Sequence, residues 1–206
     1  MKKLLFISIA VLLLQFQGSA QSFGLFGGGG YTFGDDFDTE FGYGRVNESG
    51  HWNTGLIFNV NEAYGIKLSF QQQPTTGKLY DYIYGTGSGD VNVSYIMAAG
   101  QRYLPFSDVA KGFFGIELGM AIFGSPESSQ DVEKFAWGAG LGVELNPSPV
   151  IGIRIGGQML VPVQAFGGGF YVGTGGSGAG VSTFSTLWQF GFNGALVIYL
   201  SELANR

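Results

Sequence analysis

Large apolar residues alternate with small or polar ones over most of this chain, and the alternation has a period of two. Successive side chains of a β-strand point to opposite faces, so this period is that of a strand and not of a helix. Residues 134–145, KFAWGAGLGVEL, show it plainly: Phe135, Trp137 and Leu141 share one face, while the other holds glycine, alanine and two charged residues. A chain made of such segments is restricted to all-β architectures, either a sandwich or a barrel.

Eight segments carry the alternation, and we predict that each forms one strand. They are residues 23–33, 51–61, 64–71, 91–105, 113–123, 134–145, 150–163 and 187–200. In residues 91–105 we assign to the large apolar face Val91, Val93, Tyr95, Met97 and Tyr103. The opposite face of this segment then holds Asn92, Ser94, Ala98, Gly100 and Arg102.

The composition of the second face decides which side of the strands is buried. That face is mostly Gly, Ala, Asn and Gln, and charged residues make up only 12% of the chain, against about 25% in soluble domains. Small, mildly polar side chains suit the crowded interior of a narrow barrel, so the large apolar face points outward to lipid. The alternative is a secreted soluble barrel or sandwich with its apolar face inside.

The connections between the segments alternate in length. The short ones are residues 61–63, 106–111 and 146–149. The long ones are residues 34–50, 72–90, 124–133 and 164–186. Transmembrane barrels have short periplasmic turns and longer extracellular loops, so this order predicts four outer loops and both termini in the periplasm.

The N-terminus has the three parts of a secretory signal. Lys2 and Lys3 precede an apolar run over residues 4–14, and the small residues Gly18-Ser19-Ala20 follow it. We expect residues 1–20 to be a signal peptide and residues 21–206 to form the barrel domain. Removal of the two lysines changes the net charge from −5 to −7, and such an acidic chain is a poor partner for nucleic acid.

With this signal, the SFGLFGGGGYTF that follows it, the alternating strands and the closing QFGFNGALVIYL, the chain resembles a known family. It is similar to the small eight-stranded outer-membrane β-barrel proteins of Gram-negative bacteria, the OmpA/OmpX-like group. The resemblance covers residues 21–206 and implies an eight-stranded antiparallel transmembrane up-and-down β-barrel in the outer membrane. It also implies outer-membrane lipid and lipopolysaccharide as surroundings, and the barrel-assembly machinery as a partner during biogenesis.

Five charged residues fall on the inner face of the predicted barrel: Lys67, Arg102, Glu117, Glu144 and Arg154. Counting from the short turns places Arg102 opposite Glu117, and Glu144 within one residue of facing Arg154. Because buried charges need partners, we predict one network in the periplasmic half that plugs the lumen. The alternative is a gate whose pairs exchange partners to open a narrow pore.

Aromatic residues near the strand ends are candidates for the girdles that mark the membrane interfaces. They are Trp52, Tyr64, Tyr103, Phe114, Phe135 and Trp188.

His51 is the single histidine and stands close to Glu48 and Ser49. Eight-stranded outer-membrane enzymes that edit lipid acyl chains use a His with a Ser and a carboxylate, and His–Ser is a general nucleophile pair. Acids and serines are common in any loop, so a solvated histidine on the barrel rim is the simpler interpretation.

Two loop motifs have equally simple explanations. The first long loop contains four acidic residues that could hold Ca²⁺: Asp35, Asp36, Asp38 and Glu40. Their spacing lacks the EF-hand pattern, and outer loops are often acidic simply to stay solvated. Residues 173–178 fit GxGxxG without the βαβ context of a dinucleotide site. We expect residues 164–182 to be a flexible outer loop exposing Phe166, Phe170 and Tyr171 to a partner or to lipopolysaccharide.

The sequence thus predicts a non-catalytic outer-membrane barrel with a structural or surface-interaction role, and no motif in it indicates a cofactor or a metal. A narrow pore is the second hypothesis, a lipid-editing enzyme the third and a secreted soluble barrel the fourth. No extracellular ligand can be named, because loops vary freely on this scaffold and a fold does not imply a function.

Overall fold

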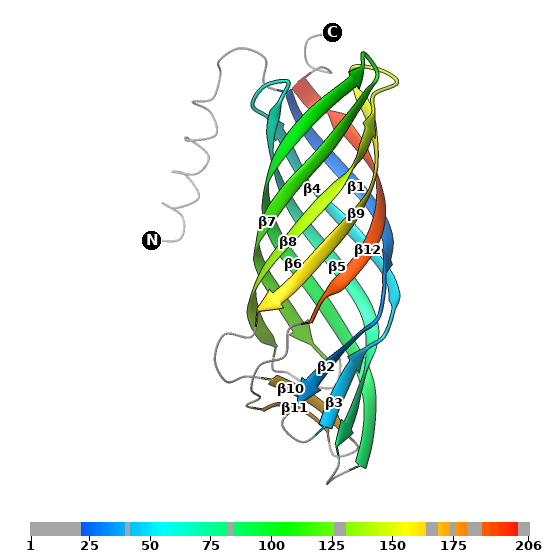
Figure 1. Ribbon diagram of the computed structural model, residues 1–206, viewed down its shortest axis with the longest axis vertical. Helices are drawn as coiled ribbons and strands as arrows, with labels where there is room; N and C mark the ends of the chain where they lie inside the picture. Colours follow the sequence, from blue (N-terminus) through cyan, green and yellow to red (C-terminus); the bar gives the residue numbers. More distant parts are fainter. Residues whose placement is uncertain are drawn as a thin grey trace, which may run out of the picture.

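The computed structural model describes residues 22–39, 42–81, 85–125, 131–163, 169–173, 176–180 and 187–201. The predicted signal peptide lies outside these residues. Within them, eight antiparallel strands close into a tall barrel (Figure 1), and each strand pairs with its neighbours in chain order around the ring. The ring strands are β1 (Ser22–Thr32), β4 (Ser49–Asn59), β5 (Tyr64–Asp81), β6 (Gly85–Ser107), β7 (Ala110–Gly124), β8 (Val132–Leu145), β9 (Ile151–Val163) and β12 (Gln189–Tyr199).

The ring closes through the pairing of β1 with β12, which joins the first strand to the last. A hydrogen bond of 3.1 Å from the Phe23 backbone amide to the Ser201 hydroxyl reinforces the closure. This is the up-and-down topology, and the predicted fold class is confirmed. No helix within the described residues is long and apolar enough to cross a membrane.

One end of the barrel carries only short turns, and we call it the short-turn end. The Asn61 side chain shapes the turn between β4 and β5, since its Oδ1 accepts hydrogen bonds of 2.9 Å from the amides of Ala63 and Tyr64. Asn side chains favour turns because they hydrogen-bond to the backbone of the next residues. β1 begins and β12 ends at this same end (Figure 1).

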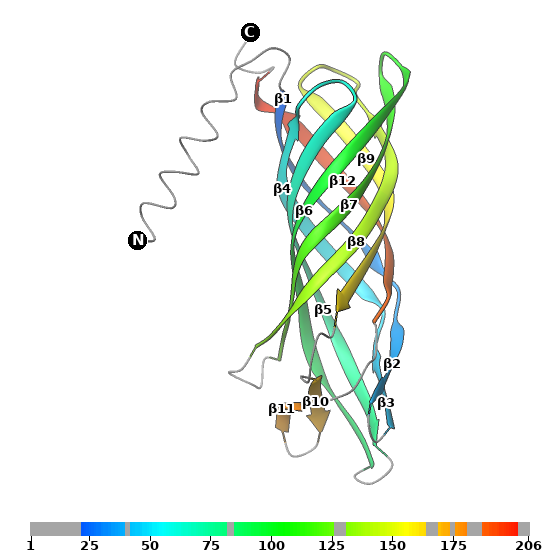
Figure 2. The same cartoon turned by 60° about the vertical axis from the view of Figure 1, so that its left-hand side comes forward.

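Paired strands continue beyond the barrel at the opposite end, which we call the hairpin end (Figure 2). β5 and β6 stay paired as far as Asp81 and Gly85, and β2 (Asp35–Thr39) and β3 (Gly42–Val46) add to the edge of β5. Most of the described residues within 34–50 and 72–90, which we expected to form loops, are therefore paired strands. These strand segments carry polar residues on both faces, so they lack the apolar alternation from which we predicted strands.

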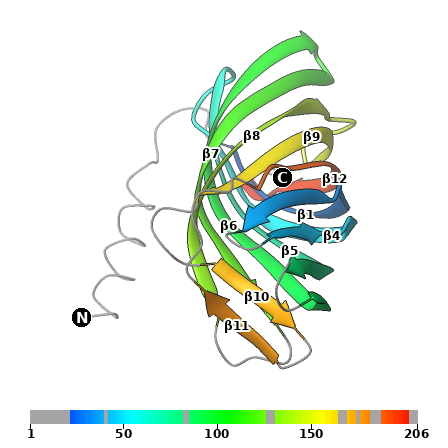
Figure 3. The ribbon, with the colours of Figure 1, turned by 60° about the horizontal axis from the view of Figure 1, so that its bottom comes forward.

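A second hairpin, β10 (Gly169–Gly173) and β11 (Gly176–Gly180), lies beside the outer part of β5 and β6 (Figure 3). It contains part of the glycine-rich segment that we expected to be a flexible loop, and it corrects that expectation for the described residues. Phe166 lies outside the described residues, and nothing is described for the side chains of Phe170 and Tyr171.

The outer surface of the barrel is apolar. Ile116, Leu141 and Ile155 are each more than 60% exposed although they lie in mid-strand. A soluble protein rarely exposes so large a continuous apolar surface, whereas a transmembrane barrel requires one.

The inner and outer faces of β6 are the reverse of the sequence assignment. Tyr95 and Tyr103 lie inside, whereas Ile96, Gly100 and Arg102 belong to the outer face. The assignment by size fails here because β6 has large residues on both faces. Glycines on neighbouring strands make room for the inward aromatic rings: a Cβ added to Gly65 would lie 2.9 Å from the Tyr103 ring.

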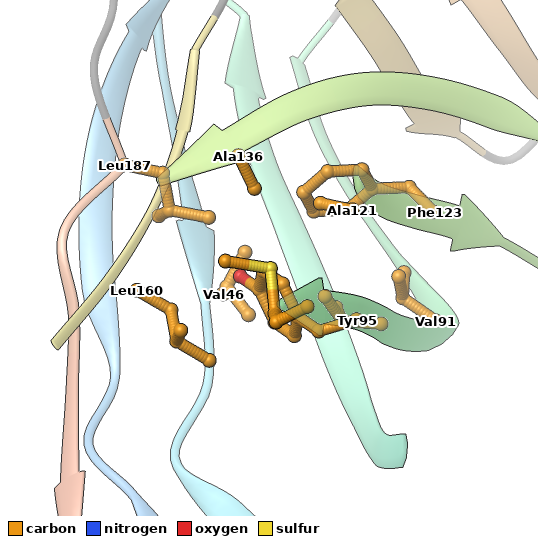
Figure 4. Packing of buried hydrophobic residues seen from close by; sticks show 10 residues of the cluster. Val46, Val91, Tyr95, Ala121, Phe123, Ala136, Leu160 and Leu187 are labelled. Atoms are coloured by element: carbon orange, nitrogen blue, oxygen red, sulfur yellow. The ribbon is translucent and has the colours of Figure 1, made fainter. Parts of the chain in front are cut away.

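An apolar core fills the hairpin end of the lumen (Figure 4), which the sequence analysis did not anticipate. We call this cluster the outer core. It brings side chains of β3, β6, β7, β8 and β9 together inside the barrel with Leu187, which precedes β12. Its buried members are Val46, Val91, Val93, Tyr95, Met97, Ala121, Phe123, Ala136, Leu160 and Leu187.

Candidate functional site

Glu144 is the centre of a charged cluster inside the short-turn half of the barrel, and its side chain is 0% exposed. Register sets its neighbours: Glu144 pairs with Lys111 of β7 on one side and with Arg154 of β9 on the other. The Lys111 Nζ lies 3.1 Å from Oε1 and the Arg154 Nε lies 3.6 Å from Oε2. Asn146 and the Tyr199 hydroxyl also donate hydrogen bonds to Oε1. Two cations therefore offset the buried charge, and the hydrogen bonds go to Oε1 while Oε2 receives none from the described residues.

A second ion pair joins Lys67 of β5 to Glu117 of β7, with Nζ 2.6 Å from Oε1. Ala99 of β6 stands between them, in register with both residues. The small alanine side chain lets the lysine reach across an entire strand inside the barrel.

Gln101 links the Glu144 cluster to the aromatic lining of the lumen. Its Oε1 accepts hydrogen bonds from the Arg154 Nη2 at 3.1 Å and from the Tyr103 hydroxyl at 3.2 Å. The Arg154 guanidinium also lies 3.9 Å from the centre of the Phe113 ring, which is a cation–π contact.

Amide side chains continue the polar lining toward the hairpin end. Gln158 donates to the Gln71 Oε1 at 2.7 Å and accepts a hydrogen bond of 2.8 Å from Asn193. The cavity between these amides and the Lys67–Glu117 pair has a volume of about 50 Å³. A space of that size holds only a few water molecules.

The predicted pairing of Arg102 with Glu117 is wrong. Arg102 pairs with Tyr64 and Phe114 on the outer face, and Glu117 pairs with Ala99. The turn between β6 and β7 is centred earlier in the chain than we estimated. Arg102 therefore pairs with Phe114, three residues before the expected partner Glu117. An odd shift exchanges the two faces of a strand, so Arg102 leaves the lumen.

Sequence reasoning also missed several residues of the lumen. Lys111 had been assigned to a turn, although the alternation of β7 extends back to it and puts it on the same face as Phe113 and Glu117. Gln101 and Tyr103 were missed because they belong to the face of β6 that we expected to point to lipid. Tyr199 lies on the inner face, as its alternation predicts, but an uncharged residue was not sought as a partner of the charged cluster.

Five of the six residues proposed for the aromatic girdles, all except Tyr103, lie on the outer face and are between 41% and 53% exposed. Tyr64 and Phe114 lie toward the short-turn end. Trp52, Phe135 and Trp188 lie toward the hairpin end. Tyr103 is the exception, because it is 1% exposed and lines the lumen.

His51 is not on a solvated rim, contrary to expectation. It is 6% exposed and points into the lumen, where its Nδ1 lies 2.9 Å from the Thr32 hydroxyl. The Ser49 hydroxyl has no hydrogen-bond partner among the described residues, so a His51–Ser49 nucleophile pair is not formed there.

Two of the acids in the first predicted loop have protein partners. Asp36 forms an ion pair of 3.2 Å with Arg45, and the Asp35 Oδ2 accepts a hydrogen bond of 2.6 Å from the Trp188 amide. Glu40 and the side chain of Asp38 are not described. The described part of the chain contains no group of three or more His, Asp or Glu that could hold a metal.

Solved structures share this fold. Neisserial surface protein A (NspA) aligns with a TM-score of 0.59 and 10% identity, covering 88% of this chain and 99% of its own. The outer membrane protein OprG from Pseudomonas aeruginosa aligns with a TM-score of 0.53 and 10% identity, covering 85% and 96%. The sequence matches no protein-family model and no curated protein. At these identities the likeness defines the class of fold, an eight-stranded up-and-down transmembrane β-barrel.

Proposed function

We propose that this protein is an outer-membrane barrel with a structural or surface-interaction role, in which a blocked barrel carries an extracellular β structure. The apolar exterior supports the membrane location, and so does the fold shared with proteins described as a surface protein and an outer membrane protein. In this arrangement the short-turn end faces the periplasm and the hairpin end faces outward. We propose a non-catalytic role, which is supported by the His51 Nδ1 lying against the Thr32 hydroxyl and not against a serine nucleophile.

The observation that carries the proposal is that the lumen is filled at two levels. The ion pairs around Glu144 and Glu117 occupy the short-turn half, and the outer core occupies the hairpin half. Each level uses a different kind of interaction, so a rearrangement of the ion pairs alone does not open a continuous water path.

The hairpin end supplies the surface for interaction. Paired strands hold its shape, and its side chains include the stacked rings of Tyr43 and Tyr80, 4.5 Å apart, and the Arg45–Asp36 pair. Exposed aromatic and arginine side chains are the residue types most often found at the energetic centre of interfaces. Lipopolysaccharide or an extracellular ligand is the proposed partner of this surface, and the barrel-assembly machinery is the proposed partner during insertion.

Ion conductance across planar bilayers tests the blocked lumen. We expect the refolded protein to give no steady single-channel current, and we expect the same silence from Glu117→Gln, because the outer core remains. Steady current from the unmodified protein would contradict the proposal.

A narrow pore is the second candidate, and one observation favours it. Three cations, Lys67, Lys111 and Arg154, share the lumen with two carboxylates, Glu117 and Glu144, next to the water-sized cavity. Spare positive charge would allow the pairs to exchange. Under this hypothesis Glu117→Gln frees Lys67 and produces or increases a current. This result distinguishes the pore from the blocked barrel, for which we expect no current.

A further inference from the structure

Arg102 is a charged residue on the apolar outer face of the barrel. It lies in register between Tyr64 of β5 and Phe114 of β7, whose side chains are 53% and 52% exposed. The guanidinium carbon lies 4.4 Å from the centre of the Tyr64 ring. None of the ion pairs among the described residues involves Arg102. Within the described part of the chain, an aromatic ring and no carboxylate therefore contacts this cation.

The position of Arg102 along the barrel axis is what makes its charge tolerable. Its partner Tyr64 is the first residue of β5 and follows directly on the turn at residues 61–63, so Arg102 is level with the turn between β4 and β5, in the part of the barrel near the short-turn end. Charged side chains on the lipid face are costly at mid-membrane and much less so near the interface, where lipid phosphates lie. A guanidinium that rests its face on a ring keeps its N–H edge free to donate hydrogen bonds.

We propose that Arg102 binds the phosphate of a glycerophospholipid in the leaflet at the short-turn end. The inference rests on the proposed function, which makes this the periplasmic leaflet. The planar fork of N–H donors in arginine matches two oxygens of one phosphate, and such charge-assisted pairs are the strong ones. The Tyr64 ring, 4.4 Å from the guanidinium carbon, helps to hold the guanidinium in place without neutralising its charge.

The surface next to Arg102 has room for the lipid chain. The next outward residue of β6 toward mid-membrane is Gly100, flanked in register by Ile66 and Ile116, which are 47% and 62% exposed. A Cβ added at Gly100 would meet no heavy atom of the described residues within 4 Å. An acyl chain lying over Gly100 contacts both isoleucines while its phosphate stays at Arg102.

Native mass spectrometry of the folded barrel in maltoside micelles, titrated with phosphatidylglycerol, tests the site. The maltoside headgroup carries no phosphate, so the added lipid is the phosphate source. We expect Arg102→Gln to weaken the first lipid-binding step about tenfold or more, because a charge-assisted contact is lost. Gly100→Leu should weaken it too, through the chain rather than the phosphate. Arg102→Lys should retain part of the affinity, and Lys78→Gln, on the outer part of β5, is the matched control and should retain all of it.

The inference would be overturned if the unmodified protein and Arg102→Gln bound the lipid with equal affinity. Both proteins must be folded, as shown by the gel mobility of unboiled samples. Inorganic phosphate that displaces the lipid at equal concentration would overturn the lipid as occupant and leave a simple anion site. Failure of the proposed function looks different, because the unmodified chain would then not insert into bilayers.

Discussion

At the scale of the residue, Glu144 shows how the barrel tolerates charge in its interior. Removing a carboxylate from a buried cluster leaves its cationic partners without compensation, which costs far more than the net contribution of the pair. Lys111 and Arg154 both contact this carboxylate, so two cations lose their partner together. Exposed pairs such as Arg45–Asp36 contribute little by comparison.

We therefore expect Glu144→Ala to lower the free energy of unfolding by about 3–5 kcal/mol. Urea unfolding of the barrel in lipid vesicles, followed by tryptophan fluorescence, measures the loss. Glu62→Gln is the control, because Glu62 lies exposed in a short turn and its removal should change the midpoint little. Equal midpoints for Glu144→Ala and the unmodified protein would show that the cluster is not a stabilising element.

At the scale of the element, the sequence predicts all eight ring strands. It does not predict how far they extend or which face of β6 points into the lumen. Alternation predicts a strand wherever one face is apolar, as in β7 and β8. It loses the outer part of β5, where Thr75 and Lys78 make the pattern polar on both faces. It misassigns β6 because Tyr95 and Tyr103 are large residues inside a barrel that was expected to hold small ones.

The same limit applies to the lumen. Glu144 and Arg154 could be brought together from the sequence because the turn between β8 and β9 is short and its centre is easily estimated. Arg102 could not be placed, because the pairing of β6 with β7 contains an irregularity between Pro105 and Ser107. Contacts that cross a strand, such as Lys67 to Glu117, depend on the closed ring, so the spacing of residues along the sequence does not predict them.

The paired outer part of β5 and β6 should be protected from amide hydrogen exchange, because its backbone N–H groups are bonded across the hairpin. Exchange of residues 77–80, followed by mass spectrometry, should be slower than that of the turn at residues 61–63. Exchange as fast as in the turn would mean that residues 72–90 form the open loop that the sequence suggested.

The outer core predicts a contrast between two leucines. Leu160 is 3% exposed inside the barrel, and Leu118 is 54% exposed on the outer face. Leu160→Ala should cost about 2–4 kcal/mol through a cavity, whereas lipid refills the space left by Leu118→Ala and the cost is smaller. Urea midpoints of the two variants measure the difference, and equal losses would argue against a packed core in the lumen.

At the scale of the whole molecule, a closed ring of hydrogen-bonded strands has no free edge from which to unfold. The folded protein in detergent should therefore resist sodium dodecyl sulfate and migrate differently on a gel until it is boiled. Boiled and unboiled samples with the same mobility would contradict a closed barrel.

The central claim is that the large apolar outer face of the barrel lies against lipid, and the three tryptophans test it directly. Trp52, Trp137 and Trp188 all belong to the outer face, and Trp137 and Trp188 contact each other with ring centres 5.9 Å apart. In vesicles of brominated phospholipid, bromine on the acyl chains quenches tryptophan fluorescence only by contact. The account predicts strong quenching relative to unbrominated vesicles. Fluorescence unchanged by bromine, from a chain that stays dissolved without detergent, would contradict it.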